Sequence, residues 1–102
     1  MYIYNVTANV QEEIHEEWLE WMKNEHIPGM LATKKFSKAL MTRVMVQEPM
    51  GGITYSVQYT AESKEMLQKY YREDAEALRK KAAVFGEKVV SFRTELEVVS
   101  EQ

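Results

Sequence analysis

Several features that would identify a class of protein at once are missing from this chain. Its 102 residues include no cysteine, which excludes disulfides, cysteine-bound zinc, iron–sulfur clusters and thiol nucleophiles. The net charge is −3, so the basic surface that nucleic-acid binding needs is absent. No apolar run approaches the roughly 20 residues of a membrane-spanning helix. We therefore expect neither a nucleic-acid partner nor a membrane partner.

Metal and cofactor motifs are equally scarce. His15 and His26 lie about three helical turns apart, too far to share one ion on a single helix. Gly51-Gly52 has the composition of a turn and precedes no helix that could bind phosphate. The opening residues lack the basic and apolar regions of a signal peptide. We expect a cytoplasmic protein with no metal and no cofactor.

The composition is that of a folded domain. Hydrophobic residues make up 45% of the chain and charged residues 28%, which is close to the average for soluble globular domains. A chain of this length can bury one modest core. No linker, repeat or low-complexity segment divides it. The prediction is a single domain over residues 1–102.

The hydrophobic periodicity changes five times along the chain. Segments that alternate apolar and polar residues, as half-buried strands do, cover 2–10, 36–47, 53–59 and 89–99. Two segments carry apolar residues at helical spacing: one is centred on Trp18 and is expected to end at Pro28-Gly29, and the other covers 63–85. The order β-α-β-β-α-β predicts an α+β, ferredoxin-like fold, with both helices on one face of a four-stranded antiparallel sheet.

The second face of that sheet would be bare. Placing Tyr4, Val57 and Phe92 on the helix side leaves a mixed set of apolar and charged residues on the other side. An ordinary solvated face is one interpretation. The other is a homodimer that stacks two sheets, which would enlarge a small core. The residues expected in this interface are Ile3, Met41, Arg43, Met45, Gln58, Arg93 and Glu95.

Local motifs in every part of the chain resemble those of one family of small bacterial proteins of unknown function, DUF4286, within the dimeric α/β-barrel superfamily. The segments that carry this resemblance are 1–6, 18–22, 25–28, 30–33, 51–59, 70–75 and 92–96. The resemblance implies a ferredoxin-like homodimer and implies no activity. The wider superfamily includes cofactor-free monooxygenases, haem-degrading enzymes and isomerases, and a shared fold does not assign one of these reactions.

Glu25, His26 and Asp74 break the pattern of their helices. On a wheel turning about 100° per residue, Glu25 projects into the apolar arc of the first helix and His26 lies at its edge. They are candidate catalytic residues, with His26 as the acid or base. Alternatively, Glu25 turns to solvent where the helix ends and His26 caps that end. Asp74 either faces a pocket or interrupts a long helix beside a partner such as Lys81.

Three functions remain open at this point. The first is a protein that binds a small molecule between helices and sheet, with Trp21, His26, Tyr55 and Asp74 as the ligand-binding residues. The second is a cofactor-independent enzyme of the isomerase or monooxygenase type that uses His26. The third is a structural or interaction dimer without a pocket, in which the aromatic residues simply fill the core.

Overall fold

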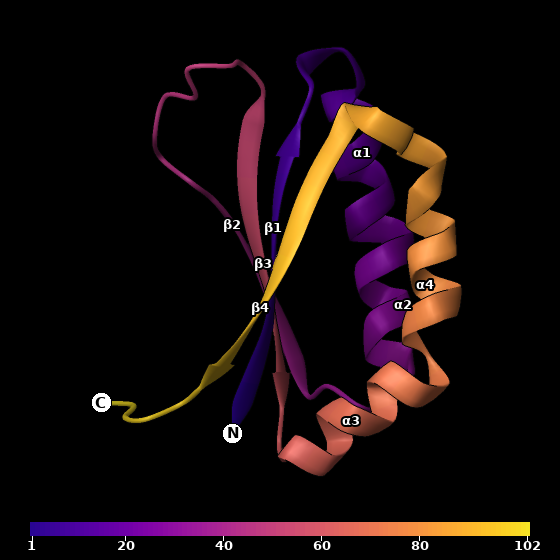
Figure 1. The fold of residues 1–102 in the computed structure, drawn as a ribbon, viewed down its shortest axis with the longest axis vertical. Coiled ribbons are helices and arrows are strands. Elements are labelled where there is room, and N and C mark those ends of the chain that lie inside the picture. The colour runs from indigo at the N-terminus through magenta and orange to yellow at the C-terminus, as the bar shows by residue number, and fades with distance from the viewer.

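One antiparallel sheet of four strands forms the frame of the computed structural model, which describes residues 1–102 (Figure 1). The strands are β1 (Tyr2–Val10), β2 (Lys38–Arg43), β3 (Ile53–Ala61) and β4 (Val89–Glu97). Their order across the sheet is β2-β3-β1-β4. Because β3 pairs antiparallel with both β1 and β2, those two strands run parallel with β3 between them. This is the split βαβ arrangement of the ferredoxin-like fold, as predicted.

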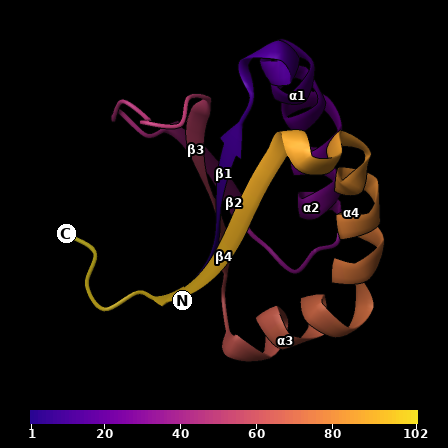
Figure 2. The same cartoon turned by 45° about the horizontal axis from the view of Figure 1, so that its top comes forward.

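The helices cover one face of the sheet only (Figures 1 and 2). The two central strands point their buried residues toward them, and directly paired residues such as Tyr4 and Tyr59, or Val6 and Val57, share that face. The core therefore lies in a single layer between sheet and helices. None of the helices is both long and apolar enough to span a membrane.

The first helical region continues beyond the predicted end. It comprises η1 (Glu12–Ile14), α1 (His15–Trp21), the π-helical segment η2 (Met22–His26) and α2 (Ile27–Ala32). The prediction that Pro28-Gly29 ends the helix is wrong. Pro28 lies in the first turn of α2, and the helix continues through it: His26 and Ile27 keep helical dihedral angles, and the Ile27 amide donates to the Met22 carbonyl across the π segment. The π segment resets the hydrogen-bond pattern just before the proline.

The second helical region is divided at Asp74. Ser63 caps α3 (Lys64–Glu73), because its Oγ accepts a hydrogen bond from the Met66 amide at 3.2 Å. Asp74 departs from helical geometry with φ −126°, and α4 (Ala75–Ala82) and η3 (Ala83–Lys88) follow. The break lets α3 cross the end of the sheet while α4 runs beside α2 (Figure 1).

A lysine from another part of the chain secures this break. Lys35 Nζ lies 2.9 Å from Asp74 Oδ2 and 3.2 Å from Glu73 Oε1. These carboxylates raise the pKa of Lys35, with the hydrogen bond to Asp74 as the largest cause. Asp74 therefore interrupts the helix and has an ionic partner, as the structural alternative predicted, although that partner is Lys35 and Lys81 lies elsewhere.

The side chains of both edge strands face opposite to the prediction. Tyr4 pairs with Glu95, Val6 with Arg93 and Val57 with Met41, so the partners share the helix-covered face. Of the residues expected on the bare face, Ile3 and Gln58 lie there. The four that lie on the helix side are Met41, Arg43, Arg93 and Glu95.

The correction has a physical reason. The helix-facing side of β4 lies at the rim of the helical layer, where charged side chains still reach water. Its large apolar residues, Phe92 and Leu96, point to the bare face, which the sequence pattern assigned to the core. β2 is also shorter than predicted, so Met45 lies beyond the strand and is exposed.

Candidate functional site

A cavity of about 70 Å³ lies between the sheet and the helices, on the β4 side of the core. Thirteen of its 17 lining residues are hydrophobic, and the interior wall includes Trp18, Met22 and Val57. The polar lining includes Arg79 of α4 and Arg93 of β4, whose side chains are both exposed. The cavity therefore has an apolar interior and a cationic rim.

The π segment η2 determines which side chain of the first helix enters this cavity. A π turn adds one residue to a helical turn, so every later side chain lags behind its α-helical position. The helical wheel assumes an unbroken α-helix, so the side-chain positions that it gives beyond this segment are displaced by one residue. Glu25 is exposed, whereas His26 is largely buried and lines the cavity. Of the two alternatives for Glu25, the structure has the one in which it turns to solvent, although the helix continues past it.

His26 sits in an environment that favours the neutral imidazole. Its ring stacks on that of Trp21, with centroids 4.7 Å apart and planes 22° apart. Burial, reinforced by the positive charges of Arg93 and Lys81, lowers its pKa from the ordinary 6.5 to about 4. Its Nδ1 is buried and has no hydrogen-bond partner within the protein. The cavity is therefore lined by an uncharged ring, one nitrogen of which is buried and has no partner.

The two arginines at the rim are free of carboxylate partners. Arg79 donates a hydrogen bond from Nη2 to the Tyr4 hydroxyl at 3.4 Å. Neither Arg79 nor Arg93 takes part in any of the ion pairs of the structure. The nearby Glu95 is engaged instead by the Tyr71 hydroxyl, which donates to its Oε2 at 2.8 Å. The rim therefore presents two guanidinium groups with donors available for a ligand.

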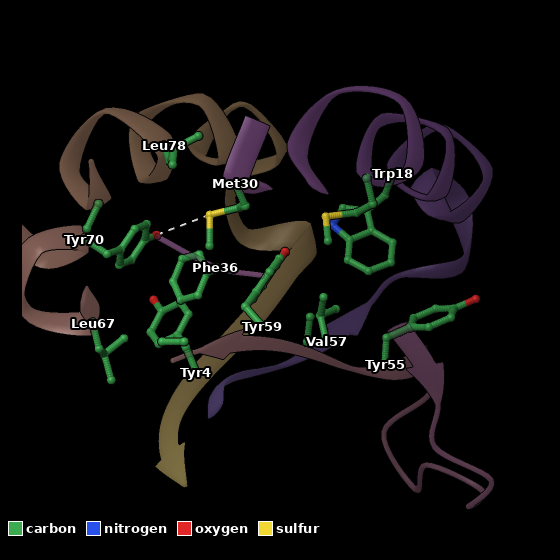
Figure 3. Packing of buried hydrophobic residues seen from close by; sticks show 14 of the residues in the cluster. Tyr4, Trp18, Met30, Phe36, Tyr55, Val57, Tyr59, Leu67, Tyr70 and Leu78 are labelled. Carbon is green, nitrogen blue, oxygen red and sulfur yellow. Dashed lines mark hydrogen bonds between the residues drawn. The ribbon is translucent and has the colours of Figure 1, made fainter. Parts of the chain in front are cut away.

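Two of the four predicted ligand-binding residues lie outside this cavity. Tyr55 belongs to a separate contact, in which its hydroxyl lies 2.6 Å from His15 Nε2 and its ring packs on Trp18. Figure 3 shows the Tyr55 hydroxyl directed away from the other labelled rings. Asp74 is held by Lys35 at the helix break. Of the predicted set, only Trp21 and His26 come together.

Sequence reasoning placed neither rim arginine at this cavity. Arg79 was not singled out, and Arg93 was assigned to the bare face. The alternation of β4 puts Arg93 on one face of the strand, but it does not say whether the helices cover that face. The structure brings no three His, Asp or Glu side chains together as a group that could hold a metal ion.

The fold and the cavity together define a ferredoxin-like α+β protein with an internal site beside an edge strand. The chain belongs to the DUF4286 family, described as a domain of unknown function, whose model matches residues 1–99. No curated protein matches the chain.

Solved structures with the same fold come from several families. An ethyl tert-butyl ether (EthD) family protein from Bacillus halodurans is 22% identical with TM-score 0.73, over 97% of this chain and 100% of that one. A dimeric ferredoxin-like protein from an uncultured marine organism is 15% identical with TM-score 0.72, covering 99% and 97%. A putative antibiotic biosynthesis monooxygenase from Deinococcus radiodurans is 10% identical with TM-score 0.63, covering 100% and 96%. At these identities the likeness establishes the fold.

Proposed function

We propose that this protein is a homodimer that binds a small molecule in the cavity beside β4. The observation that carries the proposal is a cavity with apolar walls that is lined by the uncharged ring of His26, whose buried Nδ1 has no partner within the protein. An unsatisfied buried polar group costs roughly 1–3 kcal/mol, so such groups usually have a partner, and a ligand atom would supply one. An apolar cavity with a few convergent polar groups is the usual form of a small-molecule site.

Binding explains the site better than acid–base catalysis does. A general base works best when its pKa lies near the operating pH, and the pKa of His26 is about 4. At neutral pH its imidazole is a hydrogen-bonding group of low basicity. The candidate catalytic partners are also absent from the cavity, because Glu25 is exposed and Asp74 is paired with Lys35. An isomerase or monooxygenase reaction based on His26 is therefore the weaker alternative.

The unoccupied sheet face supports the homodimer. It carries a polar centre, where Ser56 Oγ donates to Asn5 Oδ1 at 2.7 Å, between apolar flanks on the two edge strands. Leu40 on β2 is 60% exposed and Phe92 on β4 is 62% exposed, and Val90 and Leu96 share the face of Phe92, so the β4 flank is a row of exposed apolar side chains. A second copy stacked on this face would cover both flanks at once. The related marine protein with the same fold is described as dimeric.

The interface can be tested by one charge substitution. Phe92→Glu would place a carboxylate inside the stacked faces, and we expect it to convert a dimer of the 12.0 kDa chain to a monomer in light scattering. Val84→Glu is the matched control, since Val84 is 76% exposed in η3 on the helix side and should leave the mass unchanged. A wild-type monomer would contradict the dimer, and a dimeric Phe92→Glu would contradict this interface.

A native mass spectrum of the freshly purified protein tests the small-molecule site. We expect a reproducible adduct on the wild type that Ala8→Leu abolishes, because Ala8 lines the cavity and three added carbons would occupy its space. Phe92→Glu, which alters only the bare face, should keep the adduct. An adduct that survives Ala8→Leu would place the ligand elsewhere and contradict the proposal.

A further inference from the structure

We infer that the ligand is a short carboxylate anion, with its carboxylate at Arg79 and Arg93 and its apolar part inside the cavity. This inference rests on the proposed function and adds the chemical class of the ligand. It depends on three features of the same site: two guanidinium groups without carboxylate partners, an apolar interior and a small volume.

The charges at the site are one-sided. Arg79 and Arg93 line the cavity, Lys81 is close enough to affect the pKa of His26, and no carboxylate side chain lines the cavity. The chain has 16 acidic residues against 13 lysines and arginines, so acidic partners are not scarce. Both rim arginines lack one, as do Arg43 and Arg72, the other two arginines of the chain. A guanidinium fork with free donors matches the two oxygens of a carboxylate.

The interior excludes the charged end of such a ligand. The wall formed by Trp18, Met22, Met30 and Val57 offers no charge to an anion, so the carboxylate must stay at the rim. The neutral state of His26 removes the one interior cation that could have drawn the anion inward. A ligand therefore enters with its apolar end first.

The volume limits the length of that end. A cavity of about 70 Å³ holds roughly two water-sized groups at about 30 Å³ each, far below the pockets that enclose drug-sized ligands. A short or branched aliphatic tail fits, whereas a long chain or a fused ring system does not. Isobutyrate is a suitable probe, and isobutyramide is its uncharged isostere.

The two tryptophans of the chain, Trp18 and Trp21, both line the cavity, so their indole N–H signals form a complete pair of reporters in NMR spectra. We expect isobutyrate to move both signals saturably and to bind about tenfold or more tightly than isobutyramide, as charge-assisted hydrogen bonds do. High salt should reduce that preference, because the arginines are exposed.

Arginine variants identify the anion site. Arg93→Met should abolish the preference for isobutyrate over the amide, and Arg93→Lys should retain part of it. The side chain of Arg93 has no hydrogen-bond partner whose loss could disturb the fold. Arg72→Met is the matched control, because Arg72 is exposed on α3 outside the cavity and its replacement should change nothing.

The possible failures are distinguishable. Equal binding of the acid and the amide would overturn the carboxylate inference and leave the small-molecule site standing. A preference that survives Arg93→Met and Arg79→Met together would also overturn it, because the anion would then bind elsewhere. If neither probe moves the indole signals at millimolar concentration, the carboxylate inference fails, while the adduct in the native mass spectrum decides the proposed function separately.

Discussion

The two halves of the core are built differently although they share one sheet. In the half under α3, Tyr4, Phe36, Tyr59 and Tyr70 form an aromatic cluster with ring centroids 4.9 to 6.2 Å apart, and each ring is almost fully buried (Figure 3). In the half beside β4, Trp21 and Phe85 are only partly buried and the cavity remains, with Tyr4, Tyr59 and Tyr70 of the cluster forming one of its walls.

Polar atoms follow the same division. In the aromatic cluster the Tyr70 hydroxyl donates to Met30 Sδ at 3.4 Å, and burial raises the pKa of both Tyr59 and Tyr70. In the other half the Nδ1 of His26 has no partner and two arginines lack carboxylates. The closely packed half under α3 contributes more to stability. The half beside β4 contributes less, because it leaves space for a site. Proteins commonly make this exchange where they bind ligands.

The largest expected difference between the halves is in the cost of removing a phenyl ring. Phe36→Ala should lower the free energy of unfolding by about 3–5 kcal/mol, because it opens a void among three neighbouring aromatic rings. Phe85→Ala should cost roughly half as much, since Phe85 is partly exposed and its removal loses less buried apolar surface. Urea unfolding at one fixed protein concentration measures both. Equal costs would contradict the division of the core.

The second prediction concerns pH. Below pH 6.5 His26 becomes protonated in the unfolded chain, whereas in the folded chain it stays neutral until the pH falls to its pKa of about 4. The contribution of His26 to stability is therefore complete above pH 6.5 and falls as the pH drops toward 4, by about 3 kcal/mol in total.

A variant separates this effect from the titration of carboxylates, which also begins in that range. His26→Gln should lose less stability than the wild type between pH 7 and 4. Urea titrations at a series of pH values provide the comparison. Identical slopes in wild type and His26→Gln would show that His26 is not buried as described.

Adding carbon atoms should cost more stability where the core is closely packed than at the cavity. Ala61 is fully buried and lies outside the cavity, so Ala61→Leu should overpack the core and cost about 1–3 kcal/mol. Ala8 lines the cavity, so Ala8→Leu should cost less than about 1 kcal/mol. Both alanines face the helices from the central strands. A larger cost for Ala8→Leu would mean that the cavity does not accommodate the added side chain.

The smallest expected effect is electrostatic. Arg93 is the second cause of the lowered pKa of His26, after burial. Arg93→Met should raise that pKa while leaving it below 6.5, because the larger cause remains. Titration of the His26 ring protons by NMR measures the change, with Arg72→Met as control. A pKa that stays unchanged would place Arg93 too far from the ring to act on it.

The elements were predictable where one strong periodicity acts alone. In β1 and β3, one face packs on helices and the alternation of aromatic and β-branched residues is unambiguous, so their positions were correct. In β4 both faces carry apolar residues, with Val89 on one side and Phe92 on the other. Alternation alone could not say which face turns to the helices, and the larger side chains were assigned inward.

The candidate site was only half predictable, because it depends on a local irregularity. Helical periodicity singled out Glu25 and His26. The π segment displaces both side chains by one residue from their α-helical positions, and no residue type marks such a turn. Pro28 was interpreted as a terminator although it begins a new helical segment. The arginines at the rim could be recognised only once the strand register was known.

The central claim, an open half beside a closed half, is tested most directly by a crystal of the protein pressurised with xenon. Xenon enters empty apolar cavities and has no place in close-packed cores. We predict one xenon atom between Trp18, Met22 and Val57, and none beside Phe36 or Leu67, which are buried and do not line the cavity. Xenon beside Phe36 or Leu67, or an unoccupied cavity beside β4, would contradict the account.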